Sequence, residues 1–170
     1  EAQVIMMTAG KGTKEIGFTL IELLVTLVVM VILATIAVPG FQGFLAKGRY
    51  VADYNSILSG LTLARSEAVK SREDVSFILE QTDGSPPWQY AVKDDDGAEI
   101  RIADSAHESV KIFYDDATLV KKTITFNSLG RVSTDDDCDS GCNIKVEGMN
   151  DNCGVISISA YGRTGKEECE

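Results

Sequence analysis

The stretch that decides the fold is GFTLIE at residues 17–22, which opens an apolar run that continues to Val38. The run from Phe18 to Val38 holds twenty-one residues, and Glu22 is its only ionisable one. A helix rises about 1.5 Å per residue, so this run spans roughly 30 Å, the thickness of the hydrocarbon core of a bilayer. The sequence therefore predicts a membrane-spanning helix over residues 18–38. A carboxylate in such a span is costly, which predicts that Glu22 has a partner.

Charge on either side of this run predicts how it crosses the membrane. Lys11 and Lys14 precede the run, and basic residues favour the cytoplasmic side. Lys47 and Arg49 follow the run and weaken the contrast. We therefore expect a single-pass protein whose N-terminal side is cytoplasmic and whose C-terminal domain lies outside the inner membrane.

The four cysteines all lie in the last thirty-three residues, at Cys138, Cys142, Cys153 and Cys169. Such clustering is typical of disulfides formed in an oxidising compartment beyond the membrane. Four cysteines allow three pairings, and the sequence does not choose among them. A four-cysteine zinc site is a rival interpretation, although the spacing lacks the paired short knuckles of zinc ribbons. A third interpretation is that the cysteines are free thiols.

The charge balance argues against nucleic acid as the main partner, and the scarcity of catalytic residue types argues against an enzyme. The chain has 170 residues and a net charge of −10, and the part beyond Lys47 and Arg49 is more acidic still. The negatively charged phosphates of a nucleic acid repel such an acidic domain. His107 and Ser105 are too isolated to form a nucleophilic site, so we expect no enzyme, cofactor or metal. The clusters 94–96 and 135–137 lack the spacing of calcium-binding EF-hand loops and are expected to be solvated turns.

The helix is expected to continue past the membrane run as an amphipathic segment over residues 39–72. Pro39 and Gly40 predict a kink or local melting at the start of this segment, because proline removes a helix hydrogen bond. The helix then resumes and ends at about Ser71. The face predicted to pack on the following domain carries residues at helical spacing. These are Phe44, Val51, Tyr54, Leu58, Leu61, Ala64 and Ala68.

Residues 73–170 show alternating periodicity, which predicts a periplasmic β-sheet domain with a cysteine-rich C-terminal region. Residues 75–79 and 88–92, separated by the turn residues 83–87, predict a hairpin. Further strands are expected around 99–102, 110–114, 123–126, 144–146 and 155–160. The fold class is therefore α+β, in which a long N-terminal transmembrane α-helix packs on a C-terminal antiparallel β-sandwich.

The chain resembles type IV pilin-like precursors. A charged leader over residues 1–17 ends in Gly17, and GFTLIE opens the apolar helix. LARSEAV at 63–69, FNSLGRV at 126–132 and ISISAYGR at 156–163 resemble segments of the GspH/FimT-type minor pilins and pseudopilins. That family has a long N-terminal helix and a β-sandwich, so the resemblance implies the same fold. Within it, Gly130 and Gly162 are expected in turns that need a positive φ.

The resemblance implies how the N-terminus is processed and what it contacts. A prepilin peptidase would cut between Gly17 and Phe18, and the new N-terminus at Phe18 would be methylated. Glu22 would then pair with the N-terminal amine of a neighbouring subunit during assembly. The implied partners are other pilins or pseudopilins, the prepilin peptidase, the inner-membrane assembly platform and membrane lipid. The setting stays open between a type IV pilus and a type II secretion pseudopilus of a bacterial cell.

Alternative interpretations of the same residues remain. An ordinary secretory signal would be cut after the apolar run, near Ala37, but the run exceeds the usual 7–15-residue apolar region. A plain membrane anchor would need neither Gly17 nor Glu22. The charged residues of LARSEAVK, at 63–70, are expected to form a solvated helix face.

DNA binding for natural transformation is the alternative function. Some FimT-type members carry a basic G-R-x-R tail, which Gly162 and Arg163 match in part. Gly165 stands where the second arginine would be, and Lys166 is followed by three nearby glutamates. Arg163 and Lys166 are therefore the candidate nucleic-acid contacts, and carboxylates close to them disfavour DNA as a partner.

Overall fold

The computed structural model describes residues 17–81, 87–105, 110–115, 117–134 and 138–169, with Pro39 described by its backbone alone. The leader up to residue 16, most of the turn over 83–87, His107 and the acidic cluster 135–137 lie outside the described residues. The chain divides into two compact units between Gly40 and Phe41. These are called the N-terminal and C-terminal units below.

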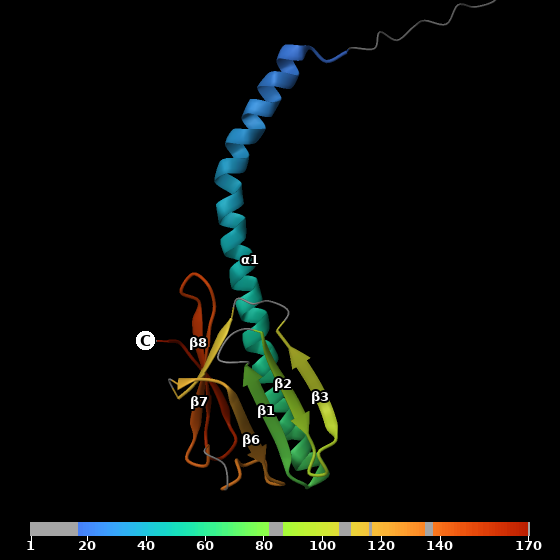
Figure 1. Ribbon diagram of the computed structural model, residues 1–170, viewed down its shortest axis with the longest axis vertical. Helices are drawn as coiled ribbons and strands as arrows, with labels where there is room; N and C mark the ends of the chain where they lie inside the picture. Colours follow the sequence, from blue (N-terminus) through green and yellow to red (C-terminus); the bar gives the residue numbers. More distant parts are fainter. Residues whose placement is uncertain (1–16, 82–86, 106–109, 116, 135–137, 170) are drawn as a thin grey trace, which may run out of the picture. The chain divides into compact units, whose positions relative to one another are not determined.

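A single helix, α1, runs over Leu20–Ser71 and accounts for 52 residues (Figure 1). Thr19 caps its start, because the Thr19 hydroxyl accepts a hydrogen bond from the backbone N–H of Glu22 at 3.2 Å. Arg72 ends it with a φ of 61° and donates its N–H to the Ala68 carbonyl at 3.0 Å. The helix continues without interruption through Pro39-Gly40. Local melting is therefore not found there, and a bend at this point stays a prediction.

The N-terminal unit leaves its apolar helix uncovered on all sides. Leu20 is 79% exposed, Val29 49% and Leu33 62%. Among the described residues, α1 is the one helix long and apolar enough to cross a membrane, with a mean hydropathy of 2.8 in its most apolar window. An α-helix that is apolar all round needs neighbours, and the described residues of this unit supply none.

The C-terminal unit contains two antiparallel sheets. The first has the order β3-β2-β1-β6, and its strands are β1 (Val75–Gln81), β2 (Trp88–Lys93), β3 (Glu99–Asp104) and β6 (Lys121–Phe126). The second has the order β5-β4-β7-β8-β9, and its strands are β4 (Lys111–Tyr114), β5 (Ala117–Thr118), β7 (Cys142–Glu147), β8 (Cys153–Ile158) and β9 (Thr164–Glu167). The α+β fold is confirmed, and all seven expected strands are present. The short strands β5 and β9 were not predicted.

One core joins the helix to both sheets. Along β1 the side chains alternate between buried and half-buried, as a period of two requires. Phe77 of β1 is paired with Val92 of β2 and with Ile124 of β6, which places apolar side chains in register across the first sheet. Ile144 and Ile156 do the same in the second sheet. All of these side chains belong to a single buried cluster that includes the second half of α1.

The buried face of α1 differs from the predicted one at its N-terminal end. Ile57, Leu61, Ala64 and Ala68 are fully buried, and Tyr54 is nearly so. Phe44, however, is 73% exposed and Val51 42% exposed, so their assignment to the packed face was wrong. A row of residues spaced by seven drifts around a straight helix by about 20° per heptad. The row of Phe44, Val51 and Leu58 therefore runs beside the buried face rather than along it.

Candidate functional site

The candidate assembly residues lie at the start of the N-terminal unit. Phe18 precedes the helix and is 82% exposed, and Gly17 stands in open space. Glu22 lies in the first turn of α1, where a negative charge is favourable to the helix dipole. Among the described residues, no cation lies within ion-pair distance of Glu22. Among the described residues, nothing covers Gly17, Phe18 or Glu22, the positions predicted to take part in cleavage and assembly.

Three segments singled out for their resemblance converge in the C-terminal unit. The Arg65 side chain, from the LARSEAV segment, donates from Nε to the Gly130 carbonyl at 3.1 Å. Gly162 packs so closely on the same carbonyl that a Cβ at Gly162 would collide with it. A Cβ at Gly130 would approach Val69 Cγ2 to 2.9 Å. We name Arg65, Gly130 and Gly162 the glycine junction. The solvated-face interpretation is wrong for Arg65.

The first turn of the junction is closed by Asn127. The Asn127 carbonyl accepts a hydrogen bond from the Gly130 N–H at 2.7 Å. The Asn127 N–H donates to the Arg131 carbonyl at 2.9 Å. Asn127 Oδ1 also accepts from the Arg131 N–H at 3.1 Å. Gly130 has a φ of 70°, which glycine adopts without a steric penalty. The expected positive-φ turn is therefore present here.

The second turn repeats this arrangement around Ser159. The Ser159 carbonyl accepts a hydrogen bond from the Gly162 N–H at 2.7 Å. The Ser159 N–H donates to the Arg163 carbonyl at 3.0 Å. Ser159 Oγ accepts from the Arg163 N–H at 3.1 Å, and Gly162 has a φ of 71°. The two turns therefore share one hydrogen-bonding pattern, although 32 positions separate their glycines in the chain.

Of the other two charged residues of the LARSEAVK segment, Lys70 is solvated as expected, whereas Glu67 is half-buried. Lys70 Nζ lies 3.0 Å from Glu67 Oε2, and the Lys70 side chain is 76% exposed. An exposed pair of this spacing stabilises a helix only slightly.

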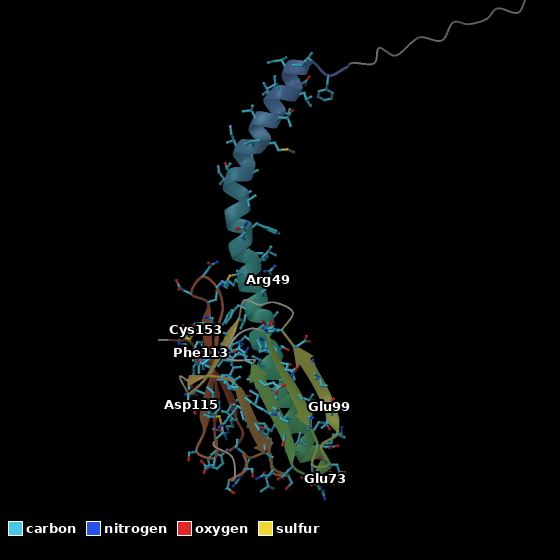
Figure 2. The ribbon with its side chains drawn as sticks, viewed as in Figure 1. Arg49, Glu73, Glu99, Phe113, Asp115 and Cys153 are labelled. Atoms are coloured by element: carbon cyan, nitrogen blue, oxygen red, sulfur yellow. A yellow bond between two sulfur atoms is a disulfide. The ribbon has the colours of Figure 1, made fainter. Side chains whose placement is uncertain are left out.

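The four cysteines form two disulfides, Cys138–Cys142 and Cys153–Cys169. This pairing selects one of the three open possibilities and removes both the zinc and the free-thiol interpretations. Cys153 stands at the start of β8 (Figure 2), so its bridge ties the segment after β9 back to the sheet. Cys138 is fully buried, and its bridge closes a loop that leads into β7.

The two candidate nucleic-acid contacts have different surroundings. Lys166 on β9 reaches α1, where its Nζ lies 3.4 Å from Asn55 Oδ1 and 5.6 Å from the centroid of the Tyr54 ring. Arg163 is exposed in the second turn. Lys166 is thus engaged by the helix, and no observation supports the DNA-binding alternative.

Tyr50 and Tyr54 fasten α1 to the second sheet. Tyr54 was expected on the packed face of the helix, whereas the role of Tyr50 and of the glycines opposite both rings was not predicted. The Tyr54 hydroxyl donates to the Val155 carbonyl at 3.0 Å. Gly148 and Gly154 leave room for the rings, because a Cβ at Gly148 would lie 2.9 Å from Tyr50 Cβ and one at Gly154 would collide with the Tyr50 hydroxyl. Burial raises the pKa of both tyrosines. A glycine opposite an aromatic ring is a signal that becomes readable only once the strands are paired.

A buried carboxylate, Asp53, was also missed. Asp53 is 7% exposed and accepts hydrogen bonds from Trp88 Nε1 at 3.3 Å and from Ser105 Oγ at 2.9 Å. Ser105 is therefore a structural partner that helps hold the first sheet against α1. Asp94 similarly has a structural role, because its Oδ1 accepts from the Ala98 N–H at 2.7 Å and shapes the turn before β3.

Comparisons with known proteins agree with this architecture. The family described as type II transport protein GspH matches residues 53–149, and the prokaryotic N-terminal methylation motif matches residues 13–38. A crystal structure of the type IV minor pilin FimU from Pseudomonas aeruginosa (strain PAO1), in space group P21, is 20% identical. It matches with a TM-score of 0.55 and covers 74% of this chain and 90% of that chain.

A second crystal form of FimU, in space group P65, is 22% identical, with a TM-score of 0.50 over 66% of this chain and 88% of that chain. Both likenesses concern the fold. No curated protein matches the chain. The GspH match covers more than half of the chain, and the methylation motif covers the start of the apolar helix. The chain therefore belongs to the GspH family and is a minor pilin or pseudopilin, a class of structural fibre proteins that assemble with other pilins after prepilin processing.

Proposed function

We propose that this chain enters a fibre by pairing Glu22 with the N-terminal amine of a neighbouring subunit. Cleavage between Gly17 and Phe18 would create an amine on Phe18, and Glu22 would be the fifth residue of the processed chain. The observation that carries this proposal is that Glu22 is the only ionisable residue between Phe18 and Val38. Within the described part of the chain it has no cation beside it.

The energetics favour a partner from another subunit. An unpaired carboxylate within a membrane span costs on the order of a few kcal/mol, and an ion pair relieves part of that cost. A charge pair also fixes the axial position of one helix against the next, so it would set the stagger between subunits. The uncovered apolar surface of residues 18–38 would then pack against neighbouring helices in the fibre interior. Pro39 and Gly40 would supply flexibility during extraction.

We place the C-terminal unit on the periplasmic side of the inner membrane. Its two disulfides are the kind of bond that forms and persists in an oxidising compartment. Lys11 and Lys14 ahead of the apolar run favour a cytoplasmic N-terminus. The inner-membrane assembly platform would then extract the subunit outward.

We favour a type IV pilus as the setting, with this chain as a minor pilin that initiates the fibre. The disulfide-bonded C-terminal region supports this choice. A type II secretion pseudopilus is the second candidate, and it is favoured by the description of the matched GspH family. A deletion strain separates the two. Loss of surface pili with normal export of folded proteins supports the pilus, whereas the reverse result supports the pseudopilus.

Replacement of Glu22 tests the pairing itself in the full-length chain. We expect Glu22→Leu and Glu22→Gln to insert into the membrane normally and to be absent from sheared fibres. Glu22→Asp keeps the charge on a shorter side chain and should restore part of the incorporation. Thr35→Leu, in the same apolar run, serves as the matched control and should incorporate normally. Normal incorporation of Glu22→Leu would sink the pairing proposal.

Mass spectrometry of the processed chain tests the preceding step. A methylated Phe18 at the N-terminus is the expected result. A chain that begins near Val38 would instead identify an ordinary secretory signal.

A further inference from the structure

The first turns of the C-terminal unit expose apolar and basic side chains together. Phe41 is 62% exposed, Phe44 73% and Leu45 40%. Lys47 and Arg49 are exposed on the same two to three turns of α1, and Figure 2 marks Arg49 there. We name these five residues the collar. They are the positions at which the helix continues beyond its apolar run.

The collar is not the packed side of the helix. Ala46, between Leu45 and Lys47, is only 8% exposed and faces the fold. A Cβ added at Gly43 or at Gly48 would meet nothing within 4 Å, so the helix surface is open at both glycines. Large apolar side chains exposed as a group, rather than singly, mark an interaction surface.

The distance from the apolar run fits the edge of a membrane. Phe41 follows Val38 by three residues, and the helix rises about 12 Å from Phe41 to Arg49. The polar region of a bilayer is about 5–7 Å thick on each side of the hydrocarbon core. Aromatic rings gather at that boundary, and long basic side chains extend from it into the headgroups. From their spacing in the sequence, we expect Phe41 and Phe44 at this boundary and Lys47 and Arg49 just beyond it.

The positive charge of Lys47 and Arg49 indicates that the collar would bind an anionic surface. The chain carries a net charge of −10, and the residues after Arg49 are more acidic than the chain as a whole. An anionic membrane would repel that domain, whereas Lys47 and Arg49 have the opposite sign. Each basic side chain near an anionic bilayer strengthens binding by about fivefold.

We propose that the collar binds the anionic phospholipid headgroups of the leaflet from which the C-terminal unit emerges. The aromatic rings and Leu45 enter the headgroup boundary, and Lys47 and Arg49 contact lipid phosphates. The collar sets the depth at which the subunit rests in the membrane before it is extracted. This interaction goes beyond the pairing of Glu22 and does not depend on it.

A depth measurement on the full-length chain in vesicles tests this proposal. All four cysteines of the chain form disulfides, so a single added thiol can be labelled. Gly43→Cys carries a fluorophore in the collar, and Lys70→Cys carries it near the end of α1. Vesicles contain phosphatidylcholine alone or mixed with phosphatidylglycerol, and a nitroxide on the headgroup reports depth. We expect strong nitroxide quenching at position 43, enhanced by phosphatidylglycerol, and none at position 70.

Charge reversal shows whether lipid phosphates hold the collar. Lys47→Glu with Arg49→Glu should remove most of the phosphatidylglycerol-dependent quenching at position 43. The matched control, Arg101→Glu with Lys111→Glu, makes the same charge change at exposed positions on β3 and β4 and should leave it unchanged. Phe41→Ser with Phe44→Ser should reduce quenching in both lipid mixtures.

Three results would overturn the proposal. One is quenching at position 43 by aqueous iodide to the same extent as at position 70. Another is full quenching by the nitroxide lipid after the Lys47 and Arg49 reversal in phosphatidylglycerol vesicles. The third is shielding of position 43 from both quenchers, which would identify a second copy of the chain as the occupant of the collar.

Discussion

The two halves of α1 differ in how far their apolar side chains are exposed. In the first half, Leu24 is 51% exposed and Leu33 62% exposed, and the apolar side chains point in every direction. In the second half, Ile57, Leu61 and Ala64 are fully buried on one face. The second half therefore satisfies its apolar face within the chain, and the first half depends on lipid or on other subunits. We therefore expect the second half of the helix to be needed for folding and the first half for assembly.

The largest expected effect comes from a substitution in the second half of α1, which we call the covered half because its apolar face is buried. Ile57→Ala removes a fully buried side chain and should lower the free energy of unfolding of the C-terminal unit by about 2–5 kcal/mol. Leu24→Ala is the matched control in the uncovered half and should leave that free energy unchanged. Denaturant unfolding followed by the fluorescence of Trp88, the only tryptophan, measures both variants. Equal losses would contradict the division between the two halves.

The glycine junction offers a second test of the covered half. Gly162→Ala combines a positive φ with a collision against the Gly130 carbonyl, and it should cost about 2–4 kcal/mol. Gly97→Ala has a similar φ of 81° but meets nothing within 4 Å, so about 1 kcal/mol is expected from the backbone alone. The same unfolding measurement applies. An equal cost at both positions would show that the close approach of the two turns adds nothing to stability.

The two disulfides test how much cross-linking of the sheets adds to the stability of the C-terminal unit. Replacement of Cys153 and Cys169 by alanine opens a loop with a sequence separation of 16, and replacement of Cys138 and Cys142 opens one of 4. Loop-closure entropy predicts losses of about 3 and about 2 kcal/mol, respectively. Membrane insertion of the N-terminal unit should not change in either variant. A larger loss from the shorter loop would show that burial of Cys138, rather than loop length, decides the effect.

The smallest expected effect is a pH dependence at the helix–sheet contact. Burial raises the pKa of Tyr54 above its ordinary value of about 10, so the folded state holds the phenolic proton more tightly than the unfolded state does. This contribution to stability is complete below pH 10 and is lost as the pH rises above that value. Tyr54→Phe should flatten the alkaline decline in stability, whereas Tyr161→Phe, at an exposed turn, should retain it. An unchanged decline in Tyr54→Phe would assign it to other groups.

Local patterns predicted most of the elements. The apolar run predicted the first half of α1, and alternation predicted β1 and β2, because each of these signals lies within a few consecutive residues. β9 was missed because Thr164–Glu167 is polar and does not alternate. It is an edge strand held by its pairing with β8. Phe44 and Val51 were misplaced because helical spacing identifies a stripe but not the molecule that covers it.

The contacts between distant segments could not be predicted in the same way. Arg65 and Gly130 are 65 positions apart, and nothing local in either segment specifies the other. The disulfide pairing is also set by the order of the strands, which brings Cys153 and Cys169 together. Glu22 and the cleavage position were readable from sequence because their pattern is contiguous, and their roles remain predictions.

The repeated turns have a consequence for how this surface can change. Each turn is closed by its own asparagine or serine and its own glycine, while the residue before the glycine projects outward. Those residues are Leu129, 70% exposed, and Tyr161, 65% exposed. Neither side chain takes part in closing its turn, and the Tyr161 ring centroid lies 5.4 Å from the Arg131 guanidinium carbon of the other turn. We therefore expect substitutions at Leu129 and Tyr161 to change the outer surface of the two turns while leaving the hydrogen bonds that close them intact.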